Sequence, residues 1–184
     1  MALIVIKETG AGLVDANSYA DVADGNGYHD GHLYATAWTA ATTANKGAAL
    51  VMATRLIDAE YQFGGTRTNA VQGLQWPRAK CPEPDALHVP LSALLPIPSD
   101  YVRYDSVPKS VVQATCEMAR ELLIADRTTA PAGEGLTYQN VGTTQTGYDK
   151  SDRRPVISRV AQAMLAKYGA LIKSRSGAVR LVRV

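Results

Sequence analysis

The stretch HDGH holds three side chains that can bind a metal ion, His29, Asp30 and His32. Two histidines three positions apart lie on one face of a helix and can share an ion. Gly31 stands between them, however, and glycine holds a helical backbone weakly. The sequence therefore favours an ordinary solvated helix end here, and it predicts no metal site.

The other reactive residues also stand outside any pattern typical of catalysis. Cys81 and Cys116 are 35 positions apart and form no CxxC pair, so two buried free thiols are the simpler interpretation. The chain has no GxSxG nucleophile turn and no GxxxxGK[ST] phosphate loop, and His88 has no obvious nucleophile near it. We predict a protein that is not an enzyme and that has no cofactor.

Basic residues next to aromatic ones are the strongest sign of a ligand, because single-stranded nucleic acids bind in basic grooves with stacking rings. Two clusters have this composition, and their members are Tyr61, Arg67, Trp76, Arg78 and Lys80, followed by Tyr101, Arg103 and Tyr104. Both clusters belong to the acidic part of the chain, which weakens this interpretation.

The charge is divided unevenly along the sequence. The last 32 residues, from Arg153, carry eight of the 19 basic side chains and none of the 17 acidic ones. Glycines and serines interrupt any helix after Tyr168, and residues 173–184 would reach roughly 40 Å if extended. We predict that this segment is an arm that docks on a partner, with DNA as a rival ligand and a disordered end as the alternative. Its predicted contact residues are Arg175, Val179, Arg180, Leu181, Val182, Arg183 and Val184.

The apolar spacing predicts helices as the main elements. They are a short helix capped by Asn17 or Ser18 with Asp21 in its first turn, a long helix from about Thr43, a helix capped by Ser106 with Pro108 in its first turn, and a last helix from near Pro155 to Tyr168. The short helix should end early, because three glycines follow within the next residues. Between the second and third predicted helices, six prolines exclude long helices and central strands.

The resulting fold class is mainly α, a small bundle of about four helices with a Pro-rich connector, a short β-hairpin and extended N- and C-terminal arms. Residues 1–172 form the helical domain, in which about 128–152 make a mobile hairpin, and residues 173–184 form the arm. The apolar run Ala2–Ile6 is too short for a signal-peptide core or a membrane span, which indicates synthesis in a host cytoplasm.

One ordered set of motifs resembles a known family. ANSY opens a short helix, Trp38 precedes a helix that ends in Ile57-Asp58, QWPR follows a glycine turn, and IPSDYV and VPKSVVQATCEMA come next. This order, over about residues 13–168, resembles the head–tail adaptor (head-completion, connector) proteins of tailed bacteriophages. A branch of that family is labelled DnaT-like single-stranded-DNA-binding. Residues 81–96 depart from the pattern, since relatives often have a shorter linker there.

The resemblance implies a structural virion protein at the head–tail junction. Such a protein forms a ring, expected to hold about twelve copies, under the portal. The ring extends the DNA channel, provides the platform for tail attachment and takes part in genome ejection. Its partners would be the portal protein, neighbouring adaptor subunits, tail or nozzle proteins, and genomic DNA passing without sequence-specific binding, but no membrane. The label of the branch implies the alternative, a DnaT-like single-stranded-DNA-binding replication protein.

Trp76 and Arg78 of the QWPR motif are the predicted anchors. A large aromatic ring beside a guanidinium is typical of interface hot spots. The alternative is that Trp76 fills the core of its own subunit while Arg78 pairs with an acidic residue of the same subunit or the next one. The sequence leaves open whether these residues serve an inter-subunit contact or the core.

Overall fold

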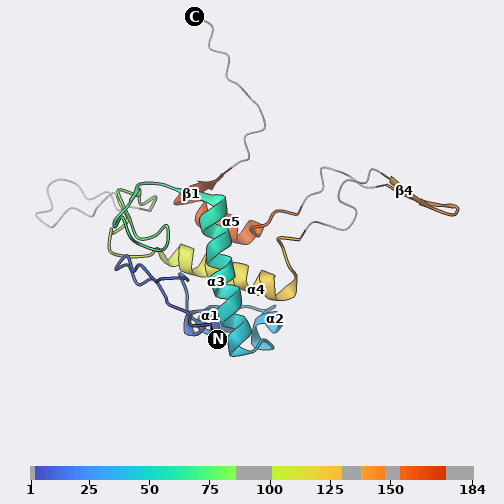
Figure 1. The fold of residues 1–184 in the computed structure, drawn as a ribbon, viewed down its shortest axis with the longest axis horizontal. Helices are drawn as coiled ribbons and strands as arrows, with labels where there is room; N and C mark the ends of the chain where they lie inside the picture. The colour runs from blue at the N-terminus through green and yellow to red at the C-terminus, as the bar shows by residue number, and fades with distance from the viewer. Residues whose placement is uncertain (1–2, 86–100, 130–137, 148–153, 173–184) are drawn as a thin grey trace, which may run out of the picture.

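A computed structural model gives the structure of residues 3–85, 101–129, 138–147 and 154–172. Its helices are α1 (Val22–Asp30), α2 (Thr36–Thr39), α3 (Thr43–Glu60), α4 (Lys109–Ile124) and α5 (Arg159–Leu165). In Figure 1, α3 and α4 cross at the centre of the body, with α1 and α2 near the start of α3 and α5 near its end. The body is therefore built around one crossed pair of helices.

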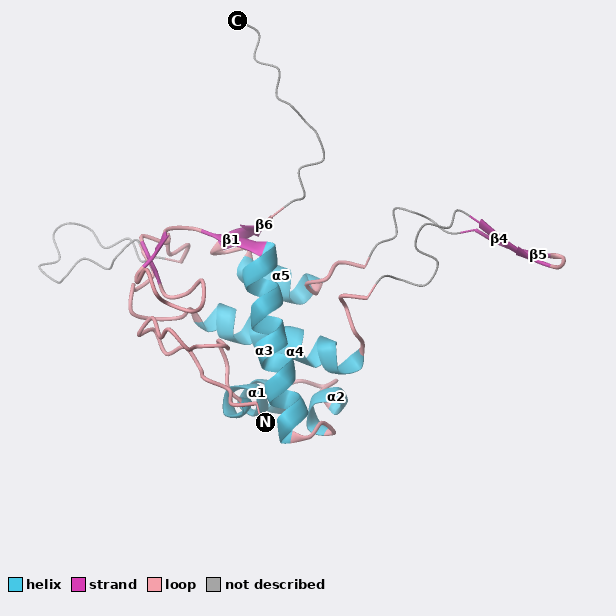
Figure 2. Cartoon of the chain, in the orientation of Figure 1, coloured by secondary structure: helices cyan, strands magenta, loops and turns pink. Residues whose placement is uncertain are grey.

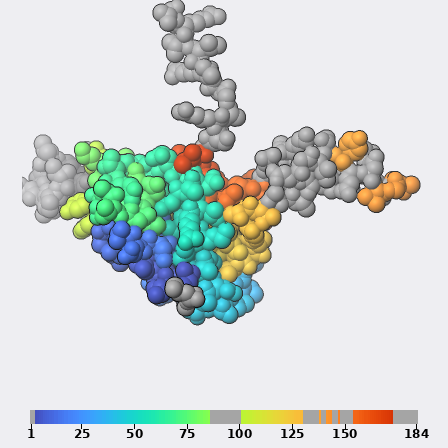
Figure 3. Space-filling model, viewed as in Figure 1, coloured from blue at the N-terminus to red at the C-terminus, as the bar shows by residue number. Residues whose placement is uncertain are grey.

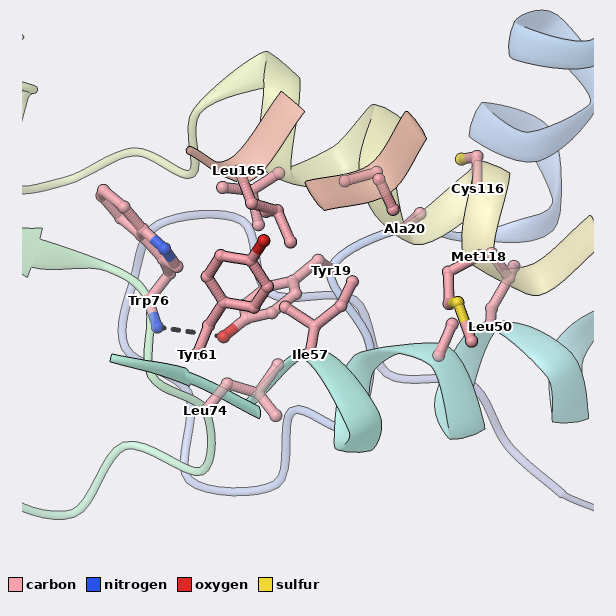
Figure 4. Close-up of a cluster of buried hydrophobic side chains, with 14 of the residues drawn as sticks. Tyr19, Ala20, Leu50, Ile57, Tyr61, Leu74, Trp76, Cys116, Met118 and Leu165 are labelled. Carbon is pink, nitrogen blue, oxygen red and sulfur yellow. Dashed lines mark hydrogen bonds between the residues drawn. The ribbon is translucent and has the colours of Figure 1, made fainter. Parts of the chain in front are cut away.

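The buried faces of α3 and α4 pack against each other in the core. Thr42 caps α3 by accepting a 3.2 Å hydrogen bond from the N–H of Asn45. Leu50 and Ile57 on α3 and Met118 on α4 are fully buried, and Figure 4 shows how such side chains converge. Burying one side chain of this size stabilises a fold by about 1.5–3 kcal/mol, so these contacts hold the crossed pair together.

Within the described residues, six short strands pair antiparallel into three two-stranded sheets (Figure 2). The strands are β1 (Tyr61–Phe63), β2 (Thr66–Arg67), β3 (Arg78–Ala79), β4 (Tyr138–Val141), β5 (Thr144–Gly147) and β6 (Gly169–Leu171). In the first sheet β1 pairs with β6, in the register Tyr61 opposite Leu171. The β2–β3 pair sets Thr66 opposite Ala79, and the β4–β5 pair forms a hairpin with Tyr138 opposite Gly147. The body is thus helical, and the small sheets join segments that lie outside the helices.

The hairpin agrees with the prediction for the polar segment, but the sequence missed the other two sheets. Their strands have two or three residues each, and β6 lies about a hundred positions beyond β1 in the chain. Runs this short carry no periodic signal, because alternation needs at least four residues. These pairings make the architecture a mixture of helices and small sheets, where the sequence predicted a helical bundle with one hairpin.

Three predicted helix boundaries need correction. Asp21 itself caps α1 in a reciprocal capping box with Asp24, and α1 runs through Gly25 and Gly27 to Asp30. Helix α4 begins after Pro108, while the hydroxyl of Ser106 bonds to a loop carbonyl. Helix α5 begins only after its cap at Ser158, because the chain from Pro155 is held in a loop by other contacts. Side-chain caps at Asp21 and Ser158 fix the starts of α1 and α5, whereas α4 starts after Pro108 without a side-chain cap.

The N-terminal segment, predicted to be an extended arm, packs on its own body from Ile6 onward. The N–H of Ile6 donates to Oδ1 of Asn17 at 2.8 Å, and the N–H of Glu8 donates to the carbonyl of Ser18 at 2.9 Å. Leu3 and Ile4, before this packed stretch, are 52% and 73% exposed. Pairing with the ANSY motif therefore replaces the predicted free arm.

The β4–β5 hairpin stands away from the helical body, as the space-filling view in Figure 3 shows. Its side chains Tyr138 and Val141 are 60% and 67% exposed.

Within the described part of the chain, no helix is both long enough and apolar enough to cross a membrane.

Candidate nucleic-acid interface

Two segments far apart in the sequence form a cleft of about 500 Å³ on the surface. One segment supplies Ala79 and Lys80, and the other is residues 101–105. The two lie side by side because the N–H of Val102 donates to the carbonyl of Cys81 at 2.8 Å, and Pro82 forms an isolated antiparallel bridge with Tyr101. The cleft therefore has two backbone walls.

The first wall is positioned by Arg78, whose guanidinium serves as a hub. Its Nε and Nη2 donate to the carbonyls of Gly64 and Gly65 at 2.6 and 2.8 Å. Its Nη1 donates to both the carbonyl and the side-chain oxygen of Gln75, at 3.1 and 3.0 Å. The planar guanidinium can satisfy these acceptors together because its donors are fixed in one plane. Arg78 thus ties the glycine turn to the QWPR loop just before Lys80.

Glycine is required at Gly65, where the turn meets the first wall. Its φ is +69°, and a Cβ there would lie 2.3 Å from the carbonyl oxygen of Ala79. Lys80 also has a positive φ, of 57°, which is uncommon for a residue with a side chain. The close approach of the two backbones sets the direction in which the chain leaves β3, and so it places Lys80 at the cleft.

The second wall is held from the N-terminal loop. Glu8 is buried, and its carboxylate accepts from the N–H groups of Gly10, Gly12 and Leu13 at 2.8–3.0 Å. This folds the loop so that Gly10, at φ +105°, packs on the backbone of Asp105, whose carbonyl oxygen a Cβ would approach to 2.1 Å. A buried carboxylate of one segment therefore supports the cleft wall formed by another.

The side chains at the cleft are aromatic and basic. Tyr101 and Tyr104 are 49% and 67% exposed, on either side of Arg103. Arg103 donates to both carboxylate oxygens of Asp105, at 2.9 and 2.7 Å, and this pairing raises the pKa of Arg103 and lowers that of Asp105. Exposed phenol rings can stack on bases, and Lys80 and the arginine can approach phosphates.

The chain matches, over residues 1–184, the protein family described as "Putative DnaT-like ssDNA binding protein". The chain belongs to this family. The match covers the whole sequence, including residues 81–96. No curated protein and no solved structure matches the chain.

For this DnaT-like protein, the structure divides the aromatic and basic candidates into two groups, and it leaves Arg67 of β2 in neither, because that residue is exposed and does not line the cleft. Lys80, Tyr101, Arg103 and Tyr104 come together at the cleft. Tyr61, Trp76 and Arg78 are at most 4% exposed, so their side chains face the interior and cannot stack on a nucleic acid. Sequence reasoning could not make this division, because exposed and buried tyrosines here have similar neighbours.

The predicted anchor Trp76 lies at the centre of an aromatic cluster in its own subunit. Its ring packs edge-on against those of Phe63 and Tyr168, 5.7 and 5.9 Å away between centroids. The Trp76–Pro77 peptide bond is cis. Arg78 bonds the backbone and Gln75 rather than an acidic residue, so both residues serve the subunit core and the turn beside the cleft.

The two histidines of HDGH point to different partners. His29 is buried, with Nε2 3.1 Å from the carbonyl oxygen of Cys116. The Nε2 of His32 lies 3.7 Å from a carboxylate oxygen of the buried Glu117, which also bonds Arg120. Burial lowers the pKa of His29 and raises that of Cys116 to about 12. Among the described residues, no cluster of three or more His, Cys, Asp or Glu is arranged for a metal.

Three other sequence predictions fall outside the residues that the structure describes. The arm residues 173–184, the greater part of residues 81–96, and His88 all lie there. Residues 81–85, the described start of the segment 81–96, directly follow Lys80 of the first cleft wall.

Proposed function

We propose that the protein binds single-stranded DNA at the cleft between residues 79–80 and 101–105. The observation that carries the proposal is the pair of exposed rings, Tyr101 and Tyr104, beside the basic side chains of Lys80 and Arg103. Stacking on an aromatic ring contributes about 1–3 kcal/mol per base and tolerates any sequence. The description of the family supports the same ligand.

The charges of the cleft determine the kind of binding that we expect. Lys80 and Arg103 supply two positive charges, and Asp105 offsets one of them. Few phosphates can therefore be neutralised, and because the salt dependence of binding scales with their number, it should be shallow. Stacking should contribute more than phosphate contacts. Single strands, whose bases are free to stack, should bind better than duplexes.

The test is fluorescence anisotropy with a labelled oligothymidine of roughly 16 nucleotides and with the matching duplex. Tyr104→Ala should weaken binding of the single strand by about 5- to 100-fold, as expected for loss of one stacking ring. Lys80→Gln should weaken it less and reduce the salt dependence. The matched control is Tyr34→Ala, which removes another exposed tyrosine remote from the cleft. Unchanged binding by Tyr104→Ala would reject the cleft as the site.

A second role, in virion assembly, is favoured by the β4–β5 hairpin. It stands away from the body with Tyr138 and Val141 exposed (Figure 3), and a two-stranded hairpin alone is marginally stable in water. A hairpin that reaches a neighbouring protein would gain the missing support. We propose the head–tail adaptor for this role, a ring under the portal through which DNA passes. The two roles are compatible, because such a ring encloses DNA.

In this second role, residues 173–184 are the proposed portal-binding arm. A chain that ends at Ser174 should stay folded and lose portal binding, which electron microscopy of the protein mixed with its portal would show. Portal binding that is unchanged by the truncation would remove the arm from the proposal. Salt separates the two roles, since phosphate contacts weaken as salt rises while apolar ring contacts do not.

A further inference from the structure

The loop between α1 and α2 presents an apolar pair to solvent. Leu33 and Tyr34 are 92% and 77% exposed, the largest values among the exposed large hydrophobic residues described. A single exposed apolar residue needs no explanation, but two adjacent ones at the tip of one loop form a compact protrusion. We call this pair the knob.

The knob is held by His32, whose ring lies edge-on to the ring of Tyr34, with 6.4 Å between the centroids. The N–H of Tyr34 donates to Nδ1 of His32 at 3.0 Å, and the N–H of His32 donates to the carbonyl of His29 at 3.0 Å. The other ring nitrogen of His32 faces the buried Glu117 on α4. A group fixed in its bound conformation loses little entropy on association. The knob is therefore preorganised for a partner.

At the other end of the molecule lies a shallow groove of about 470 Å³. Its floor is lined by small side chains of α5 and β6, Ala163, Ala166 and Ala170, and its walls include Tyr61 and Leu171. Val160 on α5 and Ile172, directly after β6, are each next in sequence to a residue that lines the groove, and both are 51% exposed. The small floor residues leave room that an aliphatic or aromatic side chain of another molecule can fill.

The knob and the groove lie at opposite ends of α3. The knob comes just before α2 and the start of α3, while Tyr61, which directly follows α3, is a wall of the groove (Figure 1). Eighteen helical residues span about 27 Å, so one molecule cannot bring its own knob to its own groove. A contact between them must join two molecules.

The charges at the two sites are complementary. Asp30 lies at the end of α1 beside the knob, and Arg159 lines the groove. Both are exposed, and neither forms an ion pair with another described residue. A knob seated in the groove would bring an unpaired carboxylate near an unpaired guanidinium, whose planar donors suit a carboxylate.

We propose that the knob of one copy docks in the groove of a second copy, as a head-to-tail contact. Because each copy carries both halves, the contact repeats from copy to copy and makes a ring if the rotation closes. The proposal rests on the assembly role and gives it a specific interface. It is independent of DNA binding at the cleft.

A mixed cross-linking experiment tests the contact in the full-length chain. One protein carries Thr36→Cys beside the knob, and a second carries Ala166→Cys in the groove. The native Cys81 and Cys116 are buried and should not react. A short bismaleimide should join the two proteins when they are mixed, and do so far less within either protein alone. Equal yields in the unmixed samples would overturn the head-to-tail geometry.

Three further variants examine the chemistry of the contact. Leu33→Ser should lower the mixed yield about tenfold, as expected for a central apolar anchor, whereas the matched exposed control Val71→Ser should not. Asp30→Arg should also lower the yield, and Arg159→Asp in the partner should restore it. If the charge swap does not restore the cross-linking yield, Asp30 of one copy does not lie beside Arg159 of the other, and the proposed docking geometry is rejected.

The outcomes separate this contact from the assembly role. If a peptide of residues 173–184 suppresses the cross-link, the groove binds that segment, and the proposal is wrong. If the protein forms a ring on its portal without the cross-link, the assembly role stands and this interface is rejected.

Discussion

The hydroxyl of Tyr19 donates a 2.5 Å hydrogen bond to Oδ1 of Asp58, near the end of α3. The other carboxylate oxygen accepts from the N–H of Gln75 at 3.0 Å. The N–H of Trp76 donates to the Tyr19 hydroxyl at 3.2 Å (Figure 4). The ANSY motif, the end of α3 and the QWPR loop, three pieces of the ordered motif set, thus meet in one buried network. Burial raises the pKa of Asp58 to about 6, against an ordinary value of 3.8.

The raised pKa of Asp58 predicts a pH-dependent stability. The native state holds the proton more tightly than the unfolded state, so its stability should fall as pH rises from about 4 to about 6 and level off above that. The shift corresponds to roughly 3 kcal/mol at most. Asp58→Asn should remove this component. Urea unfolding of both proteins across this range measures it.

The comparison with Asp58→Asn is needed because His29 has the opposite effect. Its pKa is lowered by burial, so it contributes stability that is lost as pH falls. The difference in unfolding free energy between wild type and variant cancels that contribution. Parallel curves for the two proteins would show that Asp58 does not titrate in this window.

Two glycines of α1 should respond to alanine in opposite directions. A Cβ at Gly25 would lie 2.3 Å from the ring of Trp38, whereas one at Gly27 would meet no atom within 4 Å. Gly25→Ala should therefore destabilise the protein by about 1–3 kcal/mol through overpacking. Gly27→Ala should stabilise it by about 0.5–1 kcal/mol, because alanine favours the helix. Thermal unfolding of the two variants measures both effects. Equal shifts in Tm would contradict the close contact between Gly25 and Trp38.

Gly25 also shows where sequence reasoning succeeds and fails. The start of α3 at Thr43 was predictable from apolar spacing, and the polar segment contains the predicted hairpin. The glycines were expected to end α1 early. Gly25 instead lets the helix approach Trp38, a tertiary contact that outweighs local propensity.

The residue types of the candidate site were predictable from the sequence, but which individual tyrosines lie at the cleft was not. Tyrosines beside lysines and arginines indicated a nucleic-acid ligand, and Tyr101 and Tyr104 do lie at the cleft. Tyr61 has the same residue type but is buried at the start of β1, and its hydroxyl donates to the carbonyl of Gln162 on α5. Which tyrosine is exposed depends on the long-range β1–β6 pairing, and three-residue strands carry no sequence signal for it.

Arg78 should be required for stability, although it touches no ligand. Arg78→Lys replaces a planar group of several donors by a point charge and leaves some of the carbonyls of Gly64, Gly65 and Gln75 unpaired. We expect a loss of about 2–4 kcal/mol in unfolding free energy, since these hydrogen bonds are partly buried and each acceptor that loses its donor is costly. Arg55→Lys, on the exposed face of α3, is the control and should change little. If Arg78→Lys lowers the unfolding free energy no more than Arg55→Lys does, the hydrogen bonds of Arg78 are not needed for stability.

The last prediction concerns the base of the hairpin excursion. Arg127, after α4, is buried and donates to the carbonyls of Pro155 and Val156, both at 2.8 Å, and to Glu121 at 2.7 Å. It thereby fastens the chain that leaves for the hairpin to the chain that returns from it. Arg127→Ala should cost about 2–3 kcal/mol, because two carbonyls lose their donor.

Arg154 provides the matched control for this fastening. It also bonds Glu121, at 3.1 Å, but its side chain is 58% exposed, so Arg154→Ala should cost at most about 1 kcal/mol. Hydrogen exchange should locate the difference. In Arg127→Ala, the amides that follow Val156, including the first turn of α5, should exchange faster, while those of α3 should keep their protection. If both variants behave alike, the base of the hairpin is held by charge attraction to Glu121 and not by the Arg127 hydrogen bonds.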